Sequence, residues 1–158
     1  MGSIMSEVQI EHNSKTTNDL LEIISLVQEI RTHMEYPAGF RWDPEDIKDE
    51  FKLSNCSVLK HNERVLGFVL FRQLSDAFEI TCLGTQKDSM RHGVMSQLLS
   101  SIFDHFKDPQ EWWLEVHEKN QRAIAFYQKM GFEGVGLRKG YYKDGCSAVL
   151  MKLKLASL

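Results

Sequence analysis

The pattern of apolar and polar positions changes most sharply between residues 111 and 132. Over residues 111–117 the side chains alternate, which predicts a strand. One face of this strand carries Trp112, Leu114 and Val116, and the other carries Trp113, Glu115 and His117. A carboxylate beside aromatic rings is costly unless it is used or paired. Glu115 is therefore either an ion-pair partner or a candidate catalytic group.

The helical half of this segment begins at Asn120, a favourable N-cap, and ends at Gly131. Its apolar stripe consists of Ala123, Ile124, Tyr127 and Met130. Tyr127 therefore faces inward. A strand that carries Glu115 and leads into a helix that carries Tyr127 can hold a carboxylate and a phenol over the same cleft, which suits a proton acceptor and a proton donor.

The first third of the chain predicts one strand and two helices. Residues 7–11 alternate as in a short strand, and Thr16 or Thr17 then caps a helix. The apolar stripe of that helix is Leu20, Ile23, Ile24, Val27 and Ile30. A second helix begins at Asp43, because aspartate is a good cap and proline and acidic residues follow it, and ends near Leu53.

The segment between these helices, residues 34–42, shows no periodicity and contains a proline, a glycine and three aromatic residues. Such a segment is typical of a loop that covers something, so it is a candidate lid, with Tyr36 and Phe40 as candidate substrate contacts. The alternative is a loop that packs its own aromatic residues on the core.

The rest of the chain predicts a sheet interrupted by one more helix. Residues 56–60, 64–72 and 77–85 form a three-stranded antiparallel meander, residues 95–106 a helix, and residues 132–139 and 147–155 a last hairpin. The order β-α-α-β-β-β-α-β-α-β-β is α+β, with a mixed, mostly antiparallel sheet of about seven strands and about four helices. We expect one domain over residues 1–158, with residues 1–5 a flexible start or a remnant of cloning.

Composition and charge exclude several classes of function. The net charge is −3 and no run of basic residues is present, so nucleic-acid binding is disfavoured. No stretch approaches the roughly 20 apolar residues of a membrane span. Three widely spaced cysteines, without close Cys or His pairs, favour reduced thiols, no metal site and a cytoplasmic protein, with Cys82 in the core.

Four segments carry a family resemblance: Phe78–Thr85, Met90–Met95, Trp113–Val116 and Asn120–Phe132. In order, spacing and residue type they resemble the GCN5-related N-acetyltransferase (GNAT) superfamily. The last two, together with Leu137–Tyr142, look most like its bacterial ribosomal-protein alanine acetyltransferase branch, the RimI type. Met90 and Met95 depart from the family pattern of the turn before the third helix, where only Gly93 is kept.

The resemblance implies acetyl-CoA as co-substrate and a GNAT-like domain. The backbone of Leu83, Gly84 and Thr85 would lie along the pantetheine arm. The pyrophosphate would be cradled by the turn made of Arg91, His92, Gly93, Val94, Met95 and Ser96, and the alternative is a plain strand-to-helix turn. Asn120 would contact the pantetheine, or act only as an N-cap.

For catalysis, the resemblance implies Glu115 as general base and Tyr127 as general acid, with Tyr127 also contacting the cofactor. The acceptor would contact Glu115 and the aromatic residues Tyr36, Phe40, Tyr141 and Tyr142. His117, on the same face as Glu115, is either a proton relay or a solvated histidine at the strand end.

The acceptor is expected to be a protein or peptide α-amine. An α-amine with a pKa of about 7.7 to 8.0 is partly neutral at physiological pH, whereas a lysine at about 10.4 is almost fully charged. A single carboxylate suits the easier deprotonation. The alternatives are a small-molecule amine acetyltransferase and a non-catalytic acetyl-CoA-binding module. The protein is expected to be a monomer or a homodimer.

Overall fold

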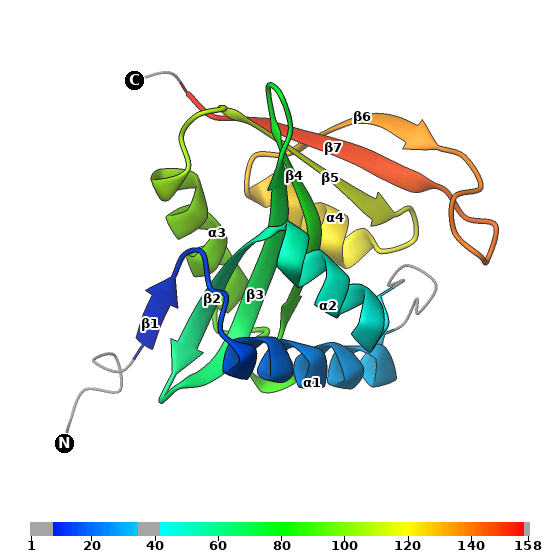
Figure 1. Ribbon diagram of the computed structural model, residues 1–158. Coiled ribbons are helices and arrows are strands. Elements are labelled where there is room, and N and C mark those ends of the chain that lie inside the picture. Colours follow the sequence, from blue (N-terminus) through cyan, green and yellow to red (C-terminus); the bar gives the residue numbers. More distant parts are fainter. Residues whose placement is uncertain (1–7, 35–41, 157–158) are drawn as a thin grey trace.

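The described residues of the computed structural model, 8–34 and 42–156, form seven strands and four α-helices (Figure 1). In chain order they are β1 (Val8–Glu11), α1 (Thr17–His33), α2 (Pro44–Leu53), β2 (Asn55–His61), β3 (Arg64–Gln73), β4 (Phe78–Thr85), a 3₁₀ turn η3 (Lys87–Ser89), α3 (Val94–His105), β5 (Glu111–His117), α4 (Gln121–Lys129), β6 (Glu133–Arg138) and β7 (Ala148–Lys154). This succession confirms the predicted order of strands and α-helices. The candidate lid, with Tyr36 and Phe40, lies almost wholly outside the described residues.

The helices begin where their capping residues predict. Thr16, one of the two candidates, accepts a hydrogen bond from the amide of Asp19 at 3.1 Å and starts α1. Asp43 and Asp46 form a reciprocal capping box at α2, with 2.9 Å between the Asp43 carboxylate and the Asp46 amide. Asn120 caps α4 through its side-chain oxygen. The ends of these elements therefore follow from local sequence.

The sheet has the order β1-β2-β3-β4-β5-β7-β6, and all neighbours are antiparallel except β4 and β5. β4 and β5 run parallel and pair only through Phe78 with Trp112 and Glu79 with Trp113. Beyond those two pairs the strands are no longer joined. The last hairpin, β6 and β7, is confirmed, and it joins the sheet through β7.

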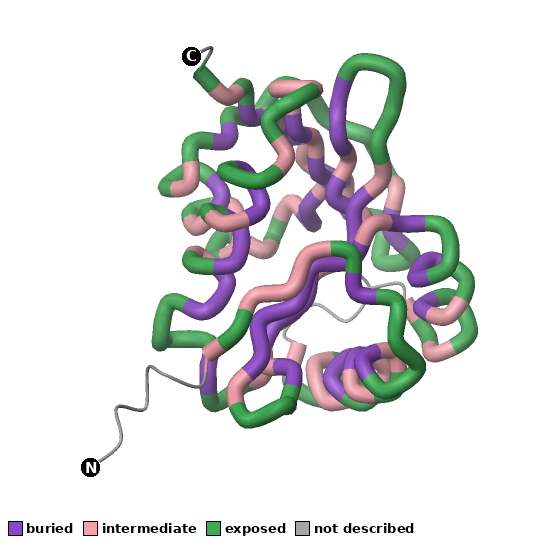
Figure 2. Tube along the Cα trace, turned by 60° about the vertical axis from the view of Figure 1, so that its left-hand side comes forward, coloured by how far each residue is buried: buried purple, intermediate pink, exposed green. Residues whose placement is uncertain are grey.

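Helices cover both faces of the sheet (Figure 1). On one face, α1 and α2 pack through Ile23, Val27, Ile47 and Phe51 against β2, β3 and β4. On the other, α3 and α4 pack against β3, β4, β5 and β7 in a second cluster centred on Trp112. Figure 2 shows the buried residues concentrated in the central strands and in the helix faces turned toward them. β6, in contrast, is exposed along its whole length.

A β-bulge bends β4 at Thr81. Leu70 of β3 pairs with Cys82 and Phe71 pairs with Ile80, which leaves Thr81 as the extra residue. The Thr81 hydroxyl lies 2.9 Å from a carboxylate oxygen of Glu50 on α2. The bulge changes the course of β4 just before its last residues, and the hydrogen bond from Thr81 to Glu50 of α2 stabilises it.

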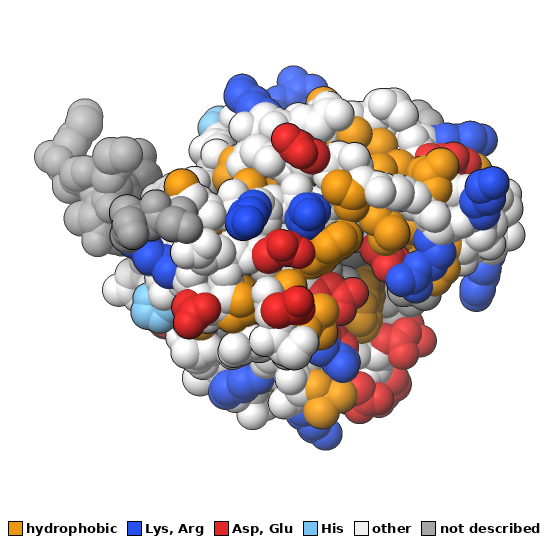
Figure 3. All heavy atoms as spheres, turned by 90° about the horizontal axis from the view of Figure 1, so that it is seen from above, with side chains coloured by type: hydrophobic (Ala, Val, Ile, Leu, Met, Phe, Trp, Pro, Cys, Tyr) orange, Lys and Arg blue, Asp and Glu red, His pale blue; other side chains and the backbone are white. Residues whose placement is uncertain are grey.

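The surface mixes both signs of charge. Figure 3 shows acidic and basic side chains interspersed with hydrophobic ones on one face of the molecule. Among the described residues, no helix combines the length and the apolar character needed to cross a membrane. All three cysteines are buried and free, which confirms the predicted core position of Cys82, while reduced thiols stay a prediction.

Candidate active site

A cavity of about 540 Å³ lies where β4 and β5 separate. Its walls come from the last residues of β4, the end of β5, the first turns of α3 and α4, and the C-terminal end of α1. The predicted site residues among its lining are Leu83, Gly84, Thr85, Met95, Glu115, Asn120 and Tyr127. Residues that were selected from four separate segments of the sequence are thus brought together.

Other predicted site residues lie elsewhere. Arg91, His92, Gly93, Val94 and Ser96 are not among the residues that line the cavity; they form the turn before α3 and its first turn. Tyr141 and Tyr142 do not line it either. Tyr142 is buried against His117, with 4.8 Å between the ring centroids, so its contact with an acceptor stays a prediction.

Glu115 is both a cavity residue and an ion-pair partner. Its side chain is 21% exposed, and Oε1 lies 2.8 Å from a terminal nitrogen of Arg138 on β6. The Arg138 guanidinium also stands over the Tyr141 ring, 4.8 Å from its centroid. The structure therefore confirms the ion-pair reading of Glu115, while its catalytic role stays a prediction.

A second carboxylate, Glu79 on β4, belongs to the same neighbourhood. Burial raises the pKa of Glu79, and the nearby charge of Glu115 raises this pKa further, while Arg72 and Arg138 oppose the shift. Sequence analysis missed Glu79, because only the parallel pairing of β4 with β5 brings it beside Glu115. Its place on the less buried face of an alternating strand was the one local signal.

Tyr127 on α4 is buried, as the apolar stripe predicts, and still lines the cavity. Burial raises the pKa of its hydroxyl above the ordinary value for tyrosine, and the proximity of Cys82 and Tyr142 adds to the rise. The phenol therefore stays protonated at neutral pH. Such a group can donate a hydrogen bond or a proton to a developing anion.

The turn before α3 presents free backbone amides. Gly93 is the N-cap residue in the left-handed conformation, with φ of 72°, and no side chain caps the helix. The first amides of a helix have no partner within it, and they lie at the positive end of the helix dipole. The Met95 side chain is buried in the hydrophobic cluster that contains Trp112, and it also lines the cavity. This arrangement fits a phosphate group.

Gly84 is required by the packing of α1 on β4. A β-carbon at Gly84 would lie 2.4 Å from the Ile30 side chain and 2.9 Å from the Phe68 ring. The resulting close approach places the C-terminal end of α1 at the cavity, where Ile30 and His33 are part of the lining. The glycine thus has a structural role beside the cofactor contact predicted for it.

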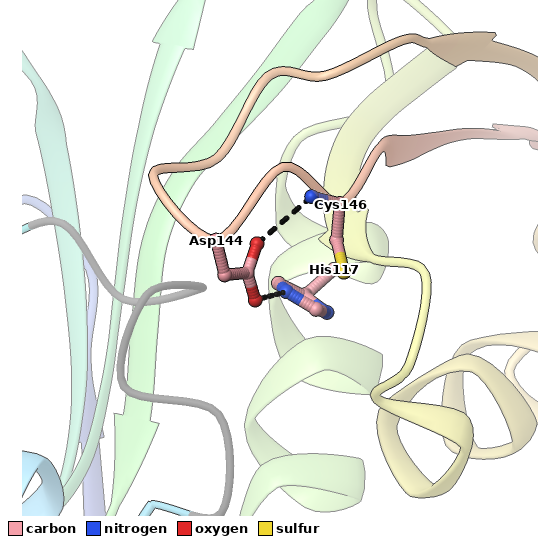
Figure 4. A group of neighbouring side chains, drawn as sticks. All are labelled: His117, Asp144 and Cys146. Atoms are coloured by element: carbon pink, nitrogen blue, oxygen red, sulfur yellow. Dashed lines mark hydrogen bonds and ion pairs between the residues drawn. The ribbon is translucent and has the colours of Figure 1, made fainter.

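His117 is not a solvated histidine, and this expectation was wrong. It is 2% exposed, and Figure 4 shows its ring beside Asp144, with 2.6 Å between Nε2 and Oδ2. The Lys119 amide donates to Nδ1 at 3.1 Å, so the proton is on Nε2 and is shared with Asp144. Because both ring nitrogens are engaged, His117 is poorly suited to relay a proton. Its burial depends on the β6–β7 connection, which lies far from it in sequence.

Cys146 completes this group, because its amide donates to Asp144 Oδ1 at 2.9 Å (Figure 4). Ligand atoms of His117, Asp144 and Cys146 lie within 4.8 Å of one another, and zinc takes such atoms. A metal at Nε2 needs the lone pair of an unprotonated nitrogen, whereas Nε2 carries the proton here. The expectation of an enzyme without a metal stays a prediction.

Comparison with protein families matches residues 20–132 to the Acetyltransferase (GNAT) family. This is more than half of the chain. The chain belongs to the GNAT family. Proteins similar to this chain include ribosomal-protein alanine N-acetyltransferases, which confirms the predicted RimI-type resemblance.

Two curated relatives are named as N-acetyltransferases. The N-alpha-acetyltransferase of Saccharolobus solfataricus is 33% identical over 91 residues, which are 54% of this chain and 54% of that protein. The ribosomal protein bS18 alanine N-acetyltransferase of Escherichia coli is 28% identical over 103 residues, 62% of this chain and 70% of the relative. The chain therefore matches only about half the length of the first of these relatives.

Solved structures of GNAT proteins confirm the fold. The crystal structure of the ribosomal-protein-S18-alanine N-acetyltransferase from E. coli has a TM-score of 0.78 at 24% identity, and the match covers 95% of this chain and 96% of that one. A GNAT acetyltransferase from Elizabethkingia anophelis, with acetyl-CoA bound, has a TM-score of 0.69 at 16% identity. The match covers 94% of this chain and 99% of that one.

Proposed function

We propose that this GNAT protein is an acetyl-CoA-dependent N-acetyltransferase that acts on a protein or peptide N-terminal α-amine. The observation that carries the proposal is the convergence of Glu115, from β5, and Tyr127, from α4, on one cavity. A carboxylate on a strand and a protonated phenol on a helix that line the same cavity are suited to remove one proton and supply another. The names of the two curated relatives support an N-terminal acceptor.

The chain offers matching groups for each part of acetyl-CoA. The amides at the start of α3, beside Gly93, would bind the pyrophosphate, supported by the positive end of the helix dipole. Leu83 to Thr85 line the cavity beyond the point where β4 and β5 are paired, so their backbone is available to the pantetheine arm. Asn120 lines the same cavity while it caps α4, and both of its predicted roles are compatible.

The reaction is a direct attack of the amine on the thioester carbonyl carbon. Acetyl-CoA supplies the acetyl group as a reactive thioester. Glu115 takes the proton that the amine loses, the new C–N bond forms and the C–S bond breaks. Tyr127 gives its proton to the departing sulfur, and solvent then restores the protonation of both side chains. Holding both reactants in one cavity supplies a large part of the rate.

The acceptor is best described as an α-amine because of the base that serves it. At physiological pH an amine with a pKa of about 7.7 to 8.0 is neutral in an appreciable fraction of molecules, and a lysine at about 10.4 is not. Glu115 is a single carboxylate already engaged by a guanidinium, so it suits an amine that gives up its proton easily. A ribosomal-type N-terminus that begins with alanine is the first acceptor to test.

The test is a panel of acceptors offered with acetyl-CoA. It contains a peptide with a free N-terminal alanine, the same peptide with a blocked N-terminus and an internal lysine, a polyamine and an aminoglycoside. Mass spectrometry locates the acetyl group, and release of free thiol gives the rate. We expect transfer to the free N-terminus and little to the blocked peptide. Transfer only to the small amines, or none at all despite CoA binding, would contradict the proposal.

A further inference from the structure

The carboxylate proposed as the base already holds a cation. Oε1 of Glu115 lies 2.8 Å from a terminal nitrogen of Arg138, and the Arg138 guanidinium lies over the Tyr141 ring. At physiological pH a fraction of the incoming amine is protonated, and this ammonium carries the same positive charge as Arg138. Arg138 and the acceptor ammonium therefore have the same partner.

A second carboxylate lies near Glu115. Burial raises the pKa of Glu79, the charge of Glu115 raises it further, and Arg72 and Arg138 oppose the shift. Arg72 is bound to Glu50, and Arg138 to Glu115. A cation that replaces Arg138 at Glu115 is therefore also attracted by the Glu79 carboxylate.

Arg138 is able to leave Glu115 without disturbing the core. Its side chain is 54% exposed, and it belongs to the edge strand β6, whose residues are all exposed. Half-exposed ion pairs of this kind are weak, because water competes for both partners. Glu115, at 21% exposure, is the less exposed member of the pair, and it lines the cavity.

We propose that Arg138 is the resting counter-ion of Glu115 and that it gives way to the acceptor ammonium. This inference rests on the proposed function and adds a residue that sets acceptor affinity. The ammonium replaces the guanidinium at Glu115, and Glu115 takes one proton from it and passes this proton to solvent. Glu115 takes the second proton from the nitrogen as the C–N bond forms. Acetylation converts the acceptor into a neutral amide that no longer binds a carboxylate ionically. Once the proton has passed to solvent, Arg138 returns to Glu115 and favours release of the product.

The first experiment compares Arg138→Gln with Lys139→Gln. Both variants remove one exposed positive charge at neighbouring positions, but Lys139 lies just beyond β6 and has no role in this inference. For Arg138→Gln we expect the KM for the amine to fall roughly twofold to fivefold, the factor that corresponds to a weak ion pair, with a much smaller change in kcat. Lys139→Gln should leave both constants unchanged. An amine KM that is unchanged or raised in Arg138→Gln overturns the inference.

The second experiment restores the missing cation from solution. In Arg138→Ala, added guanidinium ion should inhibit competitively with the amine, because it occupies the place left beside Glu115 and Tyr141. The unsubstituted enzyme should be insensitive at the same concentration, since its own guanidinium fills that place. Equal inhibition of both proteins overturns the inference. An unsubstituted protein without acetyl transfer would instead defeat the proposed function, so the two failures are distinguishable.

Discussion

Tyr127 is both a core residue and a protonated phenol. A phenol on the surface, with a pKa of about 10, is already protonated in the physiological range, and burial raises the pKa of the Tyr127 hydroxyl further. The ring packs in the core while the residue also lines the cavity. The same side chain therefore contributes to stability through its ring and to the proposed reaction through its hydroxyl.

Tyr127→Phe separates these contributions. The ring keeps its contacts, so we expect the melting temperature to stay within a few degrees, as for substitutions that leave no cavity. The loss of the proton donor should lower kcat by about 10²-fold or more, the range for general acid catalysis. Thermal unfolding and steady-state kinetics on the same preparation measure both. Retained turnover together with a large fall in melting temperature would assign Tyr127 to the core alone.

Gly93 is constrained by its backbone rather than by the space around it. Its φ of 72° is unfavourable for residues with a β-carbon, although a β-carbon would meet nothing within 4 Å. Gly140, with φ of 59° and equally open surroundings, lies in the β6–β7 connection outside the cavity lining. A residue with a β-carbon would be strained in the same way at both positions, but only Gly93 belongs to the proposed phosphate site.

Gly93→Val and Gly140→Val form a matched pair. Each should lower the free energy of unfolding by roughly 1–3 kcal/mol through backbone strain. Only Gly93→Val should also weaken CoA, at least tenfold, because the side chain stands beside the amides that bind the pyrophosphate. Calorimetric titration with CoA measures the affinities. Full CoA affinity in Gly93→Val would show that this turn is not the phosphate site.

At the level of elements, α2 secures the bulge in β4 through one buried carboxylate. Glu50 accepts hydrogen bonds from Arg72, Ser54 and Thr81. Burial acts to raise its pKa, but the hydrogen bonds from Arg72, Ser54 and Thr81 outweigh burial and hold the pKa below its usual range. The charged form of Glu50 thus stabilises the folded state at neutral pH.

This network predicts a pH-dependent difference between the unsubstituted protein and Glu50→Gln. At pH 7 the substitution should cost about 3 kcal/mol, near the lower end for a broken buried ion pair, because the Arg72 side chain is 41% exposed. A depressed folded-state pKa gives stability above the unfolded-state value of about 4.3, and this stability is lost as the pH falls through the folded-state pKa. Urea unfolding from pH 7 to pH 3 should show the difference shrinking. A difference independent of pH would contradict the assignment.

Elements defined by local signals were predictable from sequence. The Asp43 cap with Pro44 behind it set the start of α2, and the apolar stripe after Gly93 set α3. The insertion of β7 between β5 and β6 was not predictable, because alternation tells which face a residue occupies and not which strand lies beside it. The bulge at Thr81 was missed for the same reason, since only the register with β3 reveals it.

At the scale of the whole molecule, the cavity arises from the way the sheet is joined. β4 and β5 pair at one end and separate toward the other, and the helices on both faces close the space between them. Glu115 and Tyr127 were predicted from sequence because they stand five residues before and seven residues after the helix cap Asn120. Glu79, Arg138 and Asp144 were not, because each meets the site through a strand or connection that is distant in sequence.

The most direct measurement is the kcat/KM for an N-terminal peptide at pH 7 in Glu115→Gln, with Glu111→Gln as control. Glu111 lies on the same strand and face, but outside the cavity, where it accepts a hydrogen bond from Trp113. We expect a loss of about 10²-fold to 10⁴-fold in Glu115→Gln with unchanged acetyl-CoA affinity, and near-normal activity in Glu111→Gln. An unchanged kcat/KM in Glu115→Gln would remove Glu115 from the mechanism.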